Sequence, residues 1–122
     1  MARILVVDDE PSMRDLVALV LELDKHDVVT ARDGNTALEE IEKTEFDLVI
    51  TDLVMPDREG IETIINLRKS RPGLKVIAMS GGGFGSAGDY LEIAASVGAA
   101  RTLAKPFSND QLLKTVREVL GT

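Results

Sequence analysis

Acidic residues stand at two places where they could take part in chemistry together. Residues 8–10 are Asp-Asp-Glu and follow the apolar run of residues 4–7, while Asp52 follows the apolar run of residues 48–50. Two carboxylates about 5 Å apart repel by roughly 3 kcal/mol at an effective dielectric near 20. Such a cluster either raises a pKa or holds a cation, and Mg²⁺ suits it because that ion takes one or two carboxylates and bridges to phosphate oxygens.

Capping is the alternative explanation for these acids. One of residues 8–10 could cap the helix expected to begin near Pro11, and Asp52, taken alone, could cap the loop that Pro56 and Gly60 punctuate. Capping accounts for a single acid and not for the whole set.

The elements that must position these acids alternate along the chain. Short apolar runs, typical of strands buried on both faces, occupy residues 4–7, 28–29, 48–50, 76–79 and 102–104. Helical spacing of apolar residues follows each run, at about residues 11–23, 37–41, 61–67, 90–97 and 112–120. Ser108 and Gln111 have the spacing of a capping box before the last helix. Five βα units predict a parallel sheet with helices on both sides, and such sheets place their chemistry at the carboxyl ends of the strands.

Length and composition exclude several classes of protein. The 122 residues predict one domain, spanning 1–122, and the absence of cysteine excludes disulfides and thiolate metal sites. No apolar run is long enough to span a membrane and the N-terminus lacks a signal-peptide pattern, so we expect a soluble cytoplasmic protein. The net charge of −7, with no tryptophan, argues against direct nucleic-acid binding.

Two further features of the sequence are explained without a functional site. The glycine-rich stretch at residues 81–88 follows a strand as a phosphate cradle would, but it fits neither nucleotide-binding glycine motif, so we interpret it as a connection. His26, the only histidine, lies in a polar turn between Asp24 and Asp27, and we expect it to be solvated.

The strand ends also carry Ser80 and Lys105, and with them the sequence resembles the receiver domains of two-component response regulators. The resemblance covers the whole chain and is carried by LVVDDEP, DLVITDLVMPDREG, VIAMSG and GAARTLAKPF in that order. It implies a flavodoxin-like α/β fold with five helices and strand order 2-1-3-4-5, the order that the chemotaxis receiver exemplifies. In that order the first and third strands are neighbours.

The resemblance also assigns roles in phosphoryl transfer. Asp52 would be the phosphoacceptor, attacking a phosphohistidine of a partner. Lys105, whose peptide bond to Pro106 is typically cis in the family, would bind the phosphoryl oxygens. Ser80 would donate a hydrogen bond to the phosphoryl group. Positioning and charge neutralisation are what such a transfer needs.

A Mg²⁺ site is implied in the same way. Asp9 and Asp52 would bind the ion directly, Asp8 would help through water, and the backbone carbonyl of Val54 would supply another ligand. An ion pair between Lys105 and the acids is an alternative role for that lysine in the same position.

Departures from the family pattern concern the change of conformation on activation and the hydrolysis of the aspartyl phosphate. Thr102 stands where receivers usually carry an aromatic ring that swings inward on activation, so we expect ordering of the loop after Ser80 to carry more of the signal. Val54 and Gly82 stand two places after Asp52 and Ser80, where a polar side chain would orient the hydrolytic water.

The sequence therefore predicts a phosphorylatable receiver that acts as a single-domain relay, because the chain ends one turn past the last helix. Its partners would be a sensor histidine kinase or phosphotransfer protein and a downstream protein that binds the face of helix four, strand five and helix five. A receiver cut from a longer protein, and a receiver-like scaffold that acts without phosphorylation, are alternatives. A Mg²⁺-dependent aspartyl phosphohydrolase is disfavoured because Val54 occupies the place of its general acid.

Overall fold

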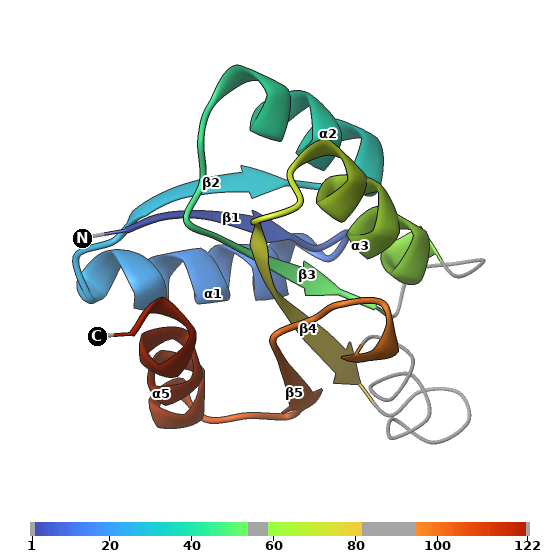
Figure 1. Cartoon of the computed structure of the whole chain (residues 1–122). Coiled ribbons are helices and arrows are strands. Elements are labelled where there is room, and N and C mark those ends of the chain that lie inside the picture. Colours follow the sequence, from blue (N-terminus) through green and yellow to red (C-terminus); the bar gives the residue numbers. More distant parts are fainter. Residues whose placement is uncertain (1, 54–58, 82–94, 122) are drawn as a thin grey trace.

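The sheet determines the architecture of the chain. A computed structural model describes residues 2–53, 59–81 and 95–121. Within them five parallel strands are hydrogen-bonded in the order β2-β1-β3-β4-β5 (Figure 1). The fold is α/β and flavodoxin-like, and the predicted strand order is confirmed.

The elements begin and end close to the sequence-based expectations. The strands are β1 (Arg3–Val7), β2 (Asp27–Ala31), β3 (Leu48–Asp52), β4 (Lys75–Gly81) and β5 (Arg101–Lys105). The helices are α1 (Pro11–Leu23), α2 (Gly34–Lys43), α3 (Glu59–Ser70) and α5 (Asn109–Leu120). The described residues thus hold four helices where the sequence predicted five, because the helix expected at residues 90–97 falls mainly on residues 82–94, outside the described ranges.

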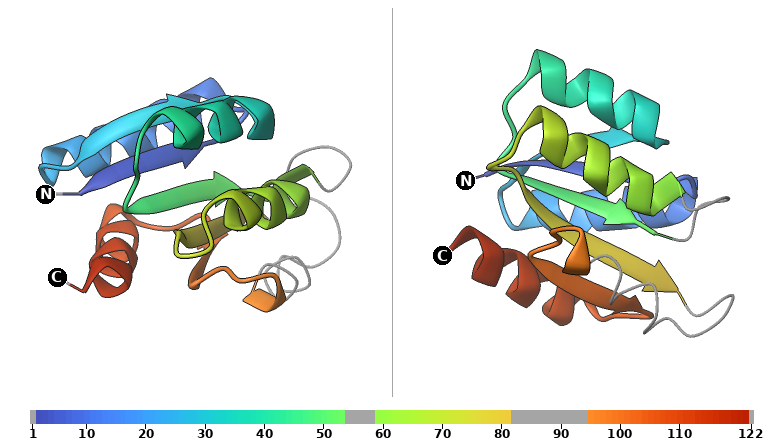
Figure 2. Two further views of the ribbon diagram at one scale, coloured as in Figure 1. Left: turned by 45° about the horizontal axis from the view of Figure 1, so that its top comes forward. Right: turned by 45° about the vertical axis from the view of Figure 1, so that its right-hand side comes forward.

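Helices cover both faces of the sheet, with α1 and α5 on one side and α2 and α3 on the other (Figures 1 and 2). Alternate residues of β1 point to opposite faces, as the period of a strand requires. Ile4 and Val6 join the core cluster under α1 and α5, whereas Leu5 and Val7 join the cluster under α2 and α3. This burial on both faces explains the uninterrupted apolar runs of the sequence.

Helix ends are fixed by a few side chains. Ser108 and Gln111 form the predicted capping box, with each side chain accepting from the other residue's backbone N–H. Asp33 caps α2 by accepting from the N–H of Thr36 at 2.8 Å, a role that the sequence analysis did not assign. The Glu10 side chain makes no capping hydrogen bond to α1, whose N-terminus begins with Pro11. Asp8 and Asp9 are therefore not needed to explain how α1 begins.

The expectation that His26 is solvated is wrong. Its side chain is only 9% exposed. The Nδ1 atom accepts a hydrogen bond from the N–H of Ala2 at 3.2 Å, and Nε2 lies 3.5 Å from a carboxylate oxygen of Asp24. The cause is the pairing of β1 with β2, which brings the beginning of the chain onto the turn that holds His26.

Across the described residues, no helix combines the length and apolarity needed to cross a bilayer.

Candidate functional site

Strand register brings the candidate residues to one edge of the sheet. Val7 of β1 pairs with Thr51 of β3, so the acids that follow these two residues lie on neighbouring strand ends. Asp52 pairs with Met79 of β4, the residue before Ser80. Ser80 in turn lies beside β5, one residue before the pairing of Gly81 with Lys105. Sequence positions nearly a hundred residues apart therefore meet at the carboxyl edge, where such sheets bind ligands.

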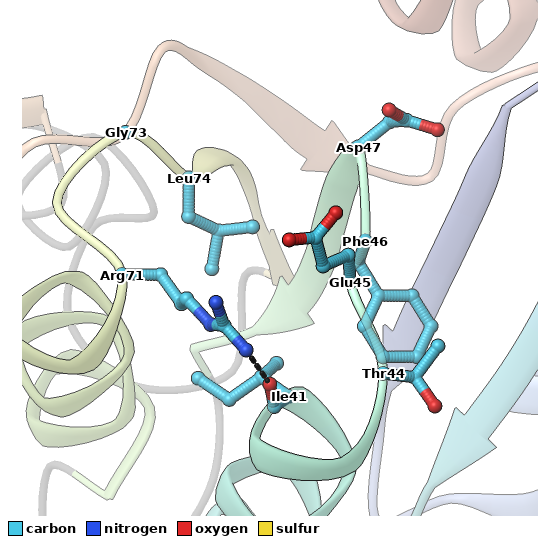
Figure 3. A pocket seen from close by; sticks show the side chains of 8 residues that line it. All are labelled: Ile41, Thr44, Glu45, Phe46, Asp47, Arg71, Gly73 and Leu74. Atoms are coloured by element: carbon cyan, nitrogen blue, oxygen red, sulfur yellow. Dashed lines mark hydrogen bonds between the residues drawn. The ribbon is translucent and has the colours of Figure 1, made fainter.

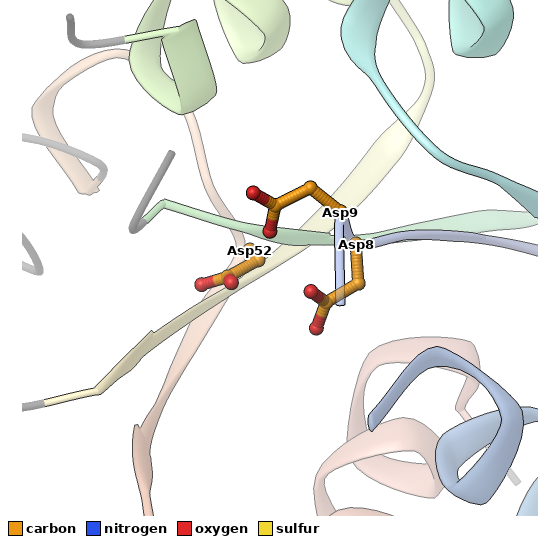
Figure 4. Close-up of side chains that lie close together, drawn as sticks. All are labelled: Asp8, Asp9 and Asp52. Atoms are coloured by element: carbon orange, nitrogen blue, oxygen red, sulfur yellow. The ribbon is translucent and has the colours of Figure 1, made fainter. Parts of the chain in front are cut away.

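Three carboxylates form a cluster at this edge. Asp8, Asp9 and Asp52 each offer an oxygen, and these three oxygens lie within 4.8 Å of one another (Figure 4). Asp8 and Asp52 are buried, while Asp9 is exposed to solvent. The predicted acid cluster is thus present, with an accessible side from which a cation can enter.

The ammonium group of Lys105 lies between the two buried acids. Lys105 Nζ is 3.2 Å from Oδ2 of Asp52 and 3.4 Å from Oδ2 of Asp8. The peptide bond from Lys105 to Pro106 is cis, as the resemblance implied. The ion pairs compensate part of the negative charge, which is the alternative role that the sequence left open for this lysine.

The pKa of the Asp8 carboxyl responds to its place in the cluster. Burial raises the pKa of the Asp8 carboxyl above its usual range, and the nearby charge of Asp52 raises it further. The N–H of Glu10, which donates to Asp8 Oδ1 at 2.9 Å, and the ammonium of Lys105 both act to lower that pKa. The balance favours the neutral acid more than water would, so a bound cation would relieve a real cost.

Ser80 supplies a buried hydroxyl at the same edge. Its side chain is fully buried, and among the described residues its Oγ has no hydrogen-bond partner. A buried polar group left without a partner costs about 1–3 kcal/mol, and a ligand at this edge of the sheet that accepts from the hydroxyl would remove this cost.

Some predicted positions do not enter this geometry. Val54 and Gly82 lie outside the described residues, as does most of the glycine-rich stretch. Thr102 is half-buried in β5 and pairs with Ala78 of β4. The residue without a ring therefore lies on the edge strand of the sheet, two residues before Ala104, the register partner of Ser80.

Sequence reasoning missed Arg14. Its Nη1 donates to the backbone carbonyl of Asp8 at 3.1 Å, so the first turn of α1 holds the strand end that carries the acids. The available signal was its place on the first helical turn after the acidic run, where an arginine can reach back to the strand.

A cavity of about 230 Å³ lies at the opposite end of the sheet. It is bordered by Phe46, Asp47 and Leu74, which precede β3 and β4 (Figure 3). Arg71 crosses it and donates to the carbonyl of Ile41 at 2.9 Å. This interaction serves the C-terminal end of α2, and the cavity contains none of the clustered acids.

Comparison with known proteins agrees with this geometry. A profile of the response regulator receiver domain family matches residues 4–117. The receiver domain of NtrX from Brucella abortus has a similar structure, with 34% identity, a TM-score of 0.90 and 98% of each chain covered. A response regulator receiver domain protein from Clostridium thermocellum has 29% identity and a TM-score of 0.89, covering 99% of this chain and 95% of that one.

Curated relatives are longer than this chain. The probable transcriptional regulatory protein TcrX of Mycobacterium tuberculosis is 30% identical over 96% of this chain, which spans 49% of TcrX. The transcriptional regulatory protein GlrR of Escherichia coli is 33% identical over 98% of this chain, which spans 26% of GlrR. The family match across nearly all of the chain, the sheet order and the acid cluster lead to one conclusion: the chain belongs to the response regulator receiver domain family.

Proposed function

We propose that the chain is a phosphoacceptor of two-component signalling, in which Asp52 receives a phosphoryl group from a phosphohistidine of a sensor histidine kinase or phosphotransfer protein. A carboxylate oxygen of Asp52 attacks phosphorus, the P–N bond of the donor breaks, and its electron pair and a proton remain on the donor imidazole. The chain assists this transfer, and the later hydrolysis, without being an enzyme that turns over a separate substrate.

Lys105 supports the transfer from the chain's own side. Its ammonium already lies 3.2 Å from the Asp52 carboxylate, so it can move from that oxygen to the phosphoryl oxygens as negative charge passes to them. Ser80 can then donate its buried hydroxyl, which has no other partner in the described residues, to one of the same oxygens. That unpartnered hydroxyl, one residue beyond the register partner of Asp52, is the observation that carries the proposal.

The donor set fits Mg²⁺. Asp9 and Asp52 would bind the ion directly and Asp8 through water, and the backbone carbonyl of Val54 is proposed as a further ligand on the resemblance alone. Hard oxygen ligands and an exposed side for retained waters are what this ion prefers. When bound, it would neutralise the phosphoryl oxygens during transfer.

The consequence of phosphorylation is proposed to be a change in protein binding. The face formed by the segment before β5, by β5 and by α5 would bind a downstream partner, in a soluble cytoplasmic relay. The names of TcrX and GlrR describe transcriptional regulation by longer proteins.

Intact mass spectrometry tests the proposal. Incubation with Mg²⁺ and a small acyl phosphate should add one phosphoryl group, about 80 Da by the mass of the transferred group, as expected for one acceptor side chain. The addition should disappear in Asp52→Ala and in excess chelator. Asp47→Ala, at an exposed acid at the other end of β3, is the matched control and should still be modified. Equal modification of Asp52→Ala and the parent would refute the assignment.

A further inference from the structure

The first turn of α3 lies directly against the backbone that carries the phosphoacceptor. Gly60 is the second residue of that helix and is buried. A Cβ atom placed on Gly60 would lie 2.6 Å from Cα of Leu53 and 2.7 Å from the carbonyl oxygen of Asp52. Real Cβ atoms essentially never approach other heavy atoms closer than 3.0 Å, and both neighbours here are main-chain atoms that no rotamer change can move away.

The backbone under Gly60 is also held from the other side. The N–H of Leu53 donates to the carbonyl of Met79 on β4 at 2.8 Å, and the Leu53 side chain is buried. Asp52 and Leu53 are therefore confined between β4 and the bare α-carbon of Gly60.

We propose that Gly60 is a positioning residue for phosphoryl transfer, because its lack of a side chain lets α3 fix the Asp52–Leu53 backbone in the reactive arrangement. The inference rests on the proposed function and adds to it a residue outside the acids, Ser80 and Lys105. Its action is indirect: the Asp52 carboxylate and the ion proposed beside it depend on where that backbone lies. Displacement of a reacting group by about 1 Å can lower a rate by roughly 100-fold.

Two other glycines provide matched controls. A Cβ on Gly34 would meet Oγ1 of Thr63 on α3, a contact as tight as that at Gly60 but with a side chain and away from Asp52. A Cβ on Gly73 would meet nothing within 4 Å. Gly34→Ala thus reports the general effect of a crowded methyl group, and Gly73→Ala reports the effect of a methyl group in open space.

The experiment compares Gly60→Ala, Gly34→Ala, Gly73→Ala and the parent. Phosphorylation rates are measured by intact mass over a series of acyl phosphate concentrations at saturating Mg²⁺, and the Mg²⁺ dissociation constant is measured separately. Sucrose at one concentration in all samples favours the folded state, and circular dichroism gives the folded fraction used to normalise each rate. Gly60→Ala should lose at least about 10-fold in maximal rate per folded molecule, with weaker Mg²⁺ binding, because only this methyl group displaces Asp52.

The outcomes separate this inference from the proposed function. An active parent with an equally active Gly60→Ala would overturn the positioning role, as would an equal loss in Gly34→Ala. Absence of phosphorylation in the parent and in Gly73→Ala alike would instead overturn the proposed function, on which the inference rests.

A measurement on the unaltered chain complements the variants. If Gly60 and β4 hold the backbone before any ligand binds, the amide hydrogen of Leu53 should exchange as slowly as those of the buried residues of β3 in metal-free protein. Exchange of the Leu53 amide at the rate of an exposed loop would contradict the proposal even if Gly60→Ala did not fold.

Discussion

Lys105 Nζ lies 3.2 Å from Oδ2 of Asp52, and it is nearly as close, at 3.4 Å, to the buried carboxylate of Asp8. The lysine side chain is itself only 15% exposed, so all three charges are withdrawn from water. This relationship links stability to function, since the same cation that compensates the acids is the one proposed to bind the phosphoryl oxygens.

Replacing the lysine should therefore weaken the fold and increase its response to magnesium. In Lys105→Met the buried acids lose their compensating charge, and the free energy of unfolding in urea without metal should fall by about 3 kcal/mol. Saturating Mg²⁺ should recover more stability in this variant than in the parent, because the ion replaces the missing charge. Lys69→Met removes an exposed lysine of α3 and serves as the control. The same loss in both variants would show that charge compensation at the site is not the cause.

Asp9 allows a clean test of the metal site, because it is exposed and its loss should hardly disturb the fold. A ligand that binds only the native state stabilises it by RT ln(1 + [L]/Kd), about 2.7 kcal/mol at 100 times Kd. Mg²⁺ should raise the melting temperature of the parent, and the shift should be much smaller for Asp9→Ala. The melting temperatures are measured by differential scanning calorimetry. Identical shifts in the parent and in Asp9→Ala would place the ion elsewhere.

Removing the charge of Asp8 should stabilise the metal-free fold, although that charge is proposed to support Mg²⁺ binding. Burial raises the pKa of Asp8, so its ionisation costs native stability as pH rises from the usual value of 3.8 through the raised folded-state pKa. Metal-free Asp8→Asn should therefore melt a few degrees higher than the parent at pH 7, and the gain should vanish below about pH 3.8, where Asp8 is neutral in both states.

The control for Asp8→Asn is the same change at the exposed neighbour, Asp9→Asn. It should leave the metal-free melting temperature nearly unchanged across that pH range. A gain for Asp8→Asn that persists unchanged at low pH would mean that the buried charge is not responsible.

Much of this site was predictable from the sequence because the ends of buried strands can be predicted from it. Uninterrupted apolar runs identify strands buried on both faces, and whatever follows such a run lies at the carboxyl edge of the sheet. Asp8, Asp52, Ser80 and Lys105 all follow or end such runs, so their gathering needed only the strand order. That order came from the resemblance to receivers, and the structure confirms it.

What the sequence could not supply were contacts between residues with no periodic relation. His26 was expected in solvent because its neighbours are polar, yet the pairing of β1 with β2 buries it against Ala2. Gly60 was interpreted as punctuation of a loop, whereas its proposed role comes from its close approach to the main-chain atoms of Asp52 and Leu53. The Gly60 contact depends on how α3 packs on the end of β3, and composition or periodicity does not encode that approach.

Ser80 should be more important after phosphorylation than before it. In the unmodified chain its buried Oγ has no partner among the described residues, so Ser80→Ala should raise the free energy of unfolding, by up to the roughly 1–3 kcal/mol that a buried polar group without a partner costs. A hydrogen bond from that hydroxyl to a charged phosphoryl oxygen is worth about 1.5–3 kcal/mol. Phosphorylation should thus stabilise the parent more than Ser80→Ala, as measured by thermal melting of both forms. Ser80→Thr, which keeps the hydroxyl, should resemble the parent, and equal stabilisation of all three would exclude the bond.

The lifetime of the phosphorylated state should be set by two positions that offer no polar side chain to orient water. Hydrolysis of an aspartyl phosphate needs a water aligned opposite the Asp52 oxygen, and the family resemblance places Val54 and Gly82 beside that approach. Neither can accept or donate a hydrogen bond through its side chain, so positioning catalysis is lost and hydrolysis should be slow. Dephosphorylation timed by intact mass under the same Mg²⁺ should be faster in Val54→Asn and in Gly82→Glu than in the parent, by about 10-fold for a well-placed polar group. Val54→Ile, which keeps the position apolar, should decay like the parent, and unchanged decay in both polar variants would show that water positioning does not limit the reaction.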